Sequence, residues 1–160
     1  MRKDQLDNVL KTLDAMKELE LQMSYLYREC SKADAGREDF WARISEQEVG
    51  HAAYIDKMIG IIGDKAQLFS AGRNFNITAV KLVIDGIKSD IEKVKSGKIK
   101  GNQLLFMASD LEQSLLEKEF TEIVKSENSQ YTELADRIME ETFMHRTLLE
   151  REIRDSAVKR

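Results

Sequence analysis

No proline interrupts this chain of 160 residues. A proline inside a helix removes a hydrogen bond and clashes with the preceding turn, so long helices exclude it. A compact β protein of this length would normally use prolines in its turns and at its sheet edges. Glu, Lys, Leu, Ala, Arg and Met, which favour helices, dominate the composition. The sequence therefore predicts an all-α fold, and its length fits a single domain covering residues 1–160.

Apolar residues recur at helical spacing in five segments of the chain. These segments predict helices at about 6–33, 38–62, 77–95, 103–126 and 129–157. Short turns join the first to the second and the fourth to the fifth, so each pair should form an antiparallel hairpin. The intervening stretch is then a long crossover that carries a helix of its own. Two hairpins joined in this way predict an antiparallel four-helix bundle.

Polar side chains interrupt the apolar stripes at matching places in the two hairpins. The chain has only two histidines, His51 and His145, and each lies on a stripe that should face the core. Each also lies within about one helical turn of a glutamate, Glu48 in the first case and Glu141 in the second. A buried carboxylate without a partner is costly, so these positions indicate pairing or a metal.

Glu20 and Glu112 interrupt the stripes of the other helix in each hairpin. Glu20 precedes His51 by 51 − 20 = 31 residues, and Glu112 precedes His145 by 145 − 112 = 33 residues. The similar spacing indicates a duplicated hairpin with pseudo-twofold symmetry. Facing hairpins of this kind bring carboxylates and imidazoles to one point in the bundle. Carboxylates with one imidazole per ion suit iron or manganese.

Four motifs follow one another on the four expected bundle helices. They are ELQMSYLY at 20–27, EVGH at 48–51, DLEQSLLE at 110–117 and ETFMH at 141–145. In this order they resemble the motifs of rubrerythrin-type diiron proteins of the ferritin-like superfamily. The resemblance implies a ferritin-like bundle that holds two iron ions, with manganese as an alternative and zinc as a substitute in crystals. It implies the metal ligands Glu20, Glu48, His51, Glu112, Glu141 and His145.

The same resemblance gives Tyr27 a place beside the site, where its hydroxyl would hydrogen-bond to a ligand. Two departures from the family pattern matter. Position 142 is Thr where the last Glu-x-x-His motif should have Glu, and Glu141 stands one residue earlier. The second metal site is therefore expected to be altered, weak or lost. The rubredoxin module with its paired Cys-x-x-Cys motifs is absent, so an external protein is expected to donate electrons.

The resemblance implies a diiron or dimanganese oxidoreductase that reduces peroxide or dioxygen. Two other functions stay open on the sequence: a non-enzymatic iron-binding or storage protein, and a degenerate ferritin-like scaffold for protein contacts. Ferritin-like bundles often dimerise, so a homodimer is expected by analogy alone.

The charge and hydropathy of the chain argue against nucleic-acid and membrane partners. The net charge is −4, and acidic and basic residues are mixed along the chain, so no nucleic-acid partner is expected. No apolar run is long enough for a bilayer span, and no membrane partner is expected. The N-terminal segment lacks the apolar region of a secretory signal. Together with a single cysteine, Cys30, this predicts a cytoplasmic location.

Overall fold

The computed structural model describes residues 1–72, 76–114 and 123–158. Their secondary structure is dominated by five α-helices: α1 (Lys3–Ala33), α2 (Glu38–Asp64), α3 (Ile77–Lys95), α4 (Asn102–Ser114) and α6 (Ser129–Val158). A short 3₁₀ helix, η1 (Ala66–Leu68), leads into strand β1 (Phe69–Ala71), which pairs with strand β2 (Val124–Ser126). The predicted all-α class is confirmed, with one small sheet added. Within the described ranges, no helix has the length and apolar character needed to cross a bilayer.

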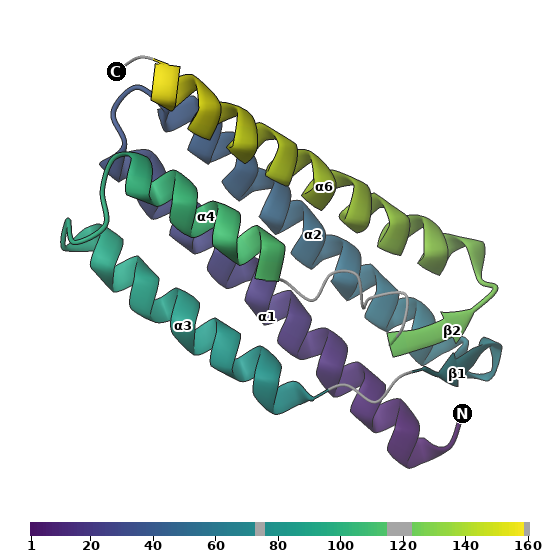
Figure 1. Ribbon diagram of the computed structural model, residues 1–160. Coiled ribbons are helices and arrows are strands. Elements are labelled where there is room, and N and C mark those ends of the chain that lie inside the picture. The colour runs from purple at the N-terminus through teal and green to yellow at the C-terminus, as the bar shows by residue number, and fades with distance from the viewer. Residues whose placement is uncertain (73–75, 115–122, 159–160) are drawn as a thin grey trace.

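The long helices lie side by side along one common direction (Figure 1). Helix α1 packs against α2 and α3, while α6 packs against α2 and α4. The turn between α1 and α2 contains Gly36, whose φ of 97° is a conformation that glycine adopts without the steric cost of a side chain. Asn76 begins α3, and its side chain accepts hydrogen bonds from the backbone N–H groups of Thr78 and Ala79.

The core consists of two apolar clusters with a polar layer between them. One cluster joins parts of α1, α2, α3 and α4 and includes Leu149 of α6. The other joins the opposite ends of α1 and α2 to the small sheet and the first turns of α6. On α2, Ile44 belongs to the first cluster and Ile55 to the second, and Glu48 and His51 lie between them in the sequence. The helices therefore bury these polar residues in the middle of their length.

The predicted helix at 103–126 is wrong at its C-terminal end. Residues 124–126 form strand β2, which pairs antiparallel with β1 so that Phe69 lies opposite Ser126 and Ala71 opposite Val124. Residues 115–122 of the predicted helix lie outside the described ranges. The β-branched Val124 suits a strand, and β1 supplies hydrogen bonds that helical periodicity cannot reveal. The pairing partner comes from the crossover, more than 50 residues earlier in the chain.

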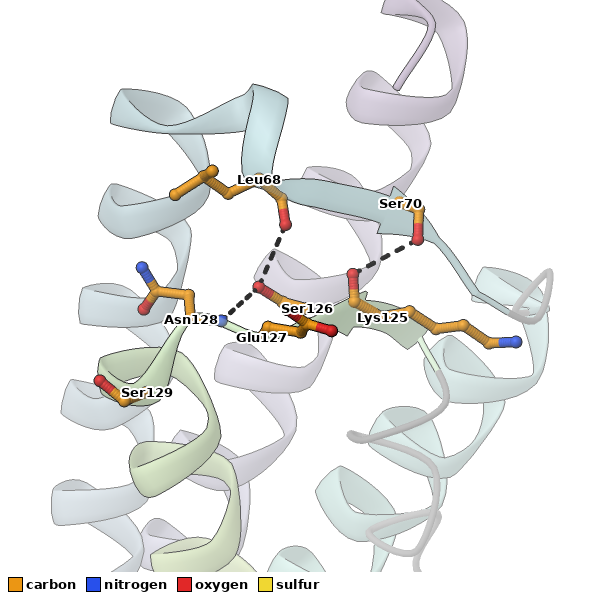
Figure 2. Close-up of a pocket in the computed structure, with 7 residues that line it drawn as sticks. All are labelled: Leu68, Ser70, Lys125, Ser126, Glu127, Asn128 and Ser129. Carbon is orange, nitrogen blue, oxygen red and sulfur yellow. Dashed lines mark hydrogen bonds between the residues drawn. The ribbon is translucent and has the colours of Figure 1, made fainter.

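A surface pocket lies beside this sheet and the start of α6 (Figure 2). Its hydroxyl groups make backbone contacts: Ser70 donates to the carbonyl of Lys125, and Ser126 donates to the carbonyl of Leu68. The backbone N–H of Asn128 donates to the Ser126 hydroxyl, while the Asn128 side chain accepts from the N–H of Tyr131. The pocket therefore lies where local hydrogen bonds order the entry into α6, and no glutamate or histidine of the polar layer lines it.

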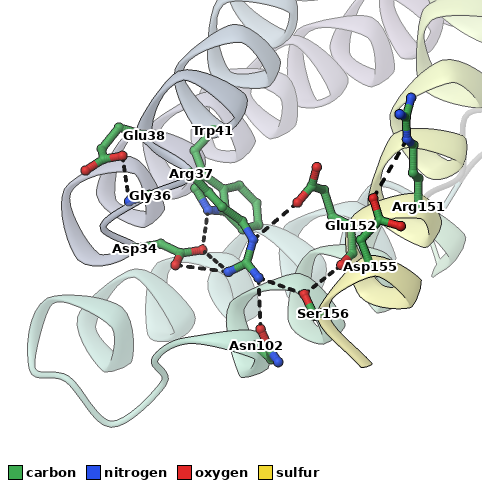
Figure 3. A network of polar contacts seen from close by, with 10 residues as sticks. All are labelled: Asp34, Gly36, Arg37, Glu38, Trp41, Asn102, Arg151, Glu152, Asp155 and Ser156. Atoms are coloured by element: carbon green, nitrogen blue, oxygen red, sulfur yellow. Dashed lines mark hydrogen bonds and ion pairs between the residues drawn. The ribbon is translucent and has the colours of Figure 1, made fainter. Parts of the chain in front are cut away.

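At the opposite end of the molecule, Arg37 joins the α1–α2 turn to two other helices (Figure 3). Its guanidinium contacts Asp34, Asn102, Glu152 and Ser156. Both carboxylate oxygens of Asp34 lie 3.1 Å from one guanidinium nitrogen, and Asp34 also accepts a 2.8 Å hydrogen bond from the indole of Trp41. This network fixes the ends of α4 and α6 against the hairpin that carries Glu48 and His51.

Candidate metal centre

Five of the six predicted ligands meet in the buried polar layer. Glu20 comes from α1, Glu48 and His51 from α2, Glu112 from α4 and His145 from α6. All five residues are almost fully buried, with at most 1% of each residue's surface exposed. Each sits on the inward face because its helix places apolar core residues one or two turns away on the same stripe.

Glu48 is shared between the two imidazoles. Its Oε2 atom lies 2.9 Å from Nδ1 of His51, and its Oε1 atom lies 3.0 Å from Nδ1 of His145. The two imidazole rings are stacked with their centroids 5.5 Å apart. One carboxylate therefore spans two nitrogen donors that belong to different helices.

The side chains form two overlapping groups of donor atoms. One group contains Glu20, Glu48 and His51, and the other contains Glu48, Glu112 and His145. Within each group the donor atoms lie within 4.8 Å of one another. Oε2 of Glu20 is 3.6 Å from Nδ1 of His51, and Oε1 of Glu112 is 3.7 Å from Nδ1 of His145. Each group can hold a metal ion.

The hydrogen bonding of these atoms fits a metal better than it fits direct pairing. Among the described residues, Oε2 of each of the three glutamates and Nδ1 of both histidines lack a well-directed hydrogen bond. Their short separations bring charges together, but the N–H directions do not aim at the oxygens. Buried polar atoms without partners are costly, and a cation between them would satisfy several at once. Oxygen and imidazole nitrogen are ligands that iron, manganese and zinc accept.

The outer nitrogens of both imidazoles contact residues of the opposite helix. Nε2 of His51 lies 3.1 Å from Oε2 of Glu141, and Nε2 of His145 lies 3.1 Å from Oε1 of Gln47. The structure thus places Glu141 behind the His51 ring and in neither donor group. Its expected role as a metal ligand stays a prediction. Its spacing of four from His145 turns the carboxylate by about 100° from the position that Glu48 holds relative to His51.

Gln47 is a site residue that the sequence analysis missed. It lies four residues before His51, as Glu141 lies four residues before His145. Aligning the two hairpins on their histidines would have paired Gln47 with Glu141. The same alignment pairs Glu48 with Thr142, which is 2% exposed and whose hydroxyl has no hydrogen-bond partner among the described residues. A small hydroxyl therefore takes the register position of a second shared carboxylate.

Tyr27 lies beside the second donor group, as expected of a residue that contacts a ligand. Its hydroxyl donates a 2.6 Å hydrogen bond to Oε1 of Glu112. The phenol ring is fully buried and packs against Trp41, with ring centroids 5.8 Å apart. Burial, together with the negative charge of Glu112, raises the pKa of Tyr27 well above its ordinary value. The phenol therefore keeps its proton and remains a hydrogen-bond donor.

The pKa values of the site residues are shifted because carboxylates and imidazoles lie close together in a region that is buried from water. Burial alone would lower the pKa of His51, but the nearby carboxylates of Glu20 and Glu48 raise it to about 11. Burial likewise opposes the shift at His145, whose pKa Glu112 and Glu48 raise to about 10. Burial raises the pKa of Glu20 to about 8, whereas the two imidazoles outweigh burial and lower the pKa of Glu48. Protonated imidazoles therefore neutralise Glu48 when no metal is bound.

No family model, curated protein or solved structure matches this chain. The class of protein is therefore defined by its own fold and site. It is an all-α protein in which four helices bury a cluster of three glutamates and two histidines that can bind a metal ion.

Proposed function

We propose that this protein is a ferritin-like four-helix bundle that holds two metal ions, iron or manganese, and reduces peroxide or dioxygen. The observation that carries the proposal is the position of Glu48, whose two oxygens lie 2.9 and 3.0 Å from the Nδ1 atoms of different histidines. A carboxylate in that position is suited to bridge two ions. The order of helices α1, α2, α4 and α6, each with a residue in the cluster, supports the same architecture.

The two donor groups support a set of protein ligands for each ion. Glu20 and His51 would hold one ion, Glu112 and His145 the other, and Glu48 both. Three protein donors per ion leave coordination positions open, as in non-haem iron sites that bind an oxidant. Three carboxylates also leave a pair of divalent ions with a net positive charge, which favours an anionic or polarisable oxygen ligand.

Bound iron or manganese would supply one-electron chemistry at each position. The chain supplies a buried enclosure, and Tyr27 holds one oxygen of Glu112 through its phenolic proton. Reduction of one peroxide to water takes up two electrons and two protons. Cys30, the single cysteine, is fully buried, and burial raises its pKa to about 12, which makes it a poor electron source. An external donor protein is therefore part of the proposal.

Metal analysis of protein purified without chelators tests the site. We expect about two iron or manganese ions per chain, and Glu48→Ala should lose both because both donor groups share this residue. Glu46→Ala, an exposed position on the same helix, is the matched control and should keep its metal. Unchanged metal content in Glu48→Ala would show that the assigned site is wrong.

Anaerobic reduction followed by rapid mixing with peroxide tests the reaction. Repeated oxidation in the presence of a reductant, with peroxide consumed in excess of the protein, supports the oxidoreductase. A single oxidation that ends with iron retained indicates a storage protein instead. Protein that binds no metal under any loading condition would leave the bundle as a scaffold for protein contacts.

A further inference from the structure

The residues behind the two imidazoles are related by the same symmetry as the imidazoles themselves. His51 on α2 contacts Glu141 on α6, and His145 on α6 contacts Gln47 on α2, each through Nε2 at 3.1 Å. Each partner lies four residues before the histidine of its own helix. The geometry is thus matched on the two sides, but the chemistry is not, because one partner is a carboxylate and the other an amide.

This difference matters because the inner nitrogen of each ring faces the donor group. When Nδ1 binds a metal, Nε2 carries the proton and becomes the donor toward its outer partner. A carboxylate accepts that hydrogen bond more strongly than an amide oxygen, because a charged acceptor strengthens the bond. A stronger bond makes the imidazole a better electron donor to the ion and holds the ring in its binding orientation.

The two outer partners also differ in charge type. The Glu141 side chain, 29% exposed, places a carboxylate beside the His51 group, whereas Gln47 places a neutral amide beside the His145 group. The ligand sets are otherwise closely matched. Each group has one histidine, the shared Glu48 and one glutamate that the other group lacks, which is Glu20 in the first group and Glu112 in the second. The outer pair therefore distinguishes the two positions, alongside the hydrogen bond that Tyr27 donates to Glu112 of the second group.

We propose that Glu141 and Gln47 are positioning residues that make the two metal positions unequal, with the His51 position binding its ion first and more tightly. This inference rests on the proposed dinuclear function. It concerns the order of filling and the properties of each ion, and not the identity of the oxidant.

Stepwise titration of the metal-free protein with Co²⁺ tests the proposal, because the imidazole N–H protons next to bound Co²⁺ give strongly shifted NMR signals. We expect one such signal with the first equivalent and a second signal with the second. Glu141→Gln, which keeps the shape of the side chain, should shift the first signal and weaken the first binding step by about tenfold. Gln47→Glu should instead strengthen the second step by a similar factor.

Combining the two substitutions exchanges the outer partners and should reverse the order of filling. The variants Glu20→Gln and Glu112→Gln each remove a donor from one metal position only. The signal that each variant loses therefore identifies the position to which that signal belongs. Two equal binding steps in the native protein, or binding steps unchanged in both single variants, would overturn the inference while leaving the dinuclear site intact. Failure to bind Co²⁺, iron or manganese at all would overturn the proposed function as well. Circular dichroism of each variant confirms that its helices are retained.

Discussion

Tyr27 and Glu112 lie 85 positions apart in the chain, yet the tyrosine hydroxyl donates a 2.6 Å hydrogen bond to the glutamate within the buried core. This contact joins α1 to α4 at the level of the buried glutamate and histidine cluster. It also leaves the other oxygen of Glu112, Oε2, free of hydrogen bonds to the described residues and able to bind a metal.

Replacing Tyr27 with Phe should destabilise the metal-free protein by about 1–3 kcal/mol, because a buried carboxylate loses its donor. Urea denaturation with and without metal measures the effect. Tyr131→Phe is the matched control, since the Tyr131 hydroxyl is buried without a partner among the described residues. We expect the control to change the free energy of unfolding by less than about 1 kcal/mol. Equal losses in both variants would contradict the role given to the Tyr27 hydroxyl.

Metal binding should strengthen as the pH rises. In the metal-free protein the pKa values of His51 and His145 are about 11 and about 10, so both rings are protonated at neutral pH. Each ion must displace one of these imidazole protons, so affinity should rise by at least about tenfold per pH unit for each ion, and more steeply next to His51 because Glu20, with a pKa of about 8, also loses a proton. Calorimetry in buffers of different ionisation enthalpy counts the protons released. Release of no protons would mean that the imidazoles are neutral before metal binds.

Glu20 and Glu112 each belong to one donor group only, so replacing either residue should remove one ion and leave the other bound. Glu20→Gln is expected to lose the ion next to His51, and Glu112→Gln the ion next to His145, because each removes a ligand that the other group does not use. Metal analysis after dialysis should give about one ion per chain for either variant. Loss of both ions in either case would instead show that the two positions fill only together.

Thr142→Glu should lower the stability of the metal-free protein and raise its affinity for metal. The new carboxylate would occupy the register position that corresponds to Glu48, in a place where Thr142 is 2% exposed. Without metal, burial of another charge should lower the free energy of unfolding by about 2 kcal/mol or more. Added Mn²⁺ should raise the melting temperature of this variant more than that of the native protein. Thr142→Val, which adds no charge, is the control and should show no larger metal effect than the native protein.

Arg37→Ala should destabilise the protein by about 2 kcal/mol or more, because Asp34 is 5% exposed and would lose its charged partner. Arg37→Lys should rescue little, since an ammonium group cannot make the same forked contacts. The nearby Arg151→Ala removes an exposed pair with Asp155 at 3.9 Å (Figure 3) and should change stability by less than about 1 kcal/mol. Thermal denaturation of the three variants compares them directly, and equal effects for Arg37→Ala and Arg151→Ala would contradict the network's structural role.

Much of the site could be predicted from the sequence because helical periodicity is a local property. The spacing of Glu48 and His51 within an apolar stripe indicates that both face the core, and the structure buries both. The same reasoning applies to Glu20, Glu112 and His145. The absence of proline and the five periodic segments likewise predicted the helices that the structure describes, to within a few residues at most of their ends.

Periodicity could not separate Glu141 from Glu48, because residues three and four positions before a histidine both lie near its helix face. What distinguishes them is the packing of α2 against α6, which turns Glu141 toward Nε2 of His51 and leaves Thr142 buried. The same packing brings Gln47 to His145.

The sequence by itself thus determined the helical class and the face of each helix that carries glutamate and histidine, since both depend on neighbours within a few turns. The tertiary structure alone decided which ring nitrogen meets which carboxylate, because those contacts join different helices. It also decided that residues 124–126 extend into a strand beside Phe69–Ala71, since the hydrogen bonds that favour a strand there come from a distant part of the chain.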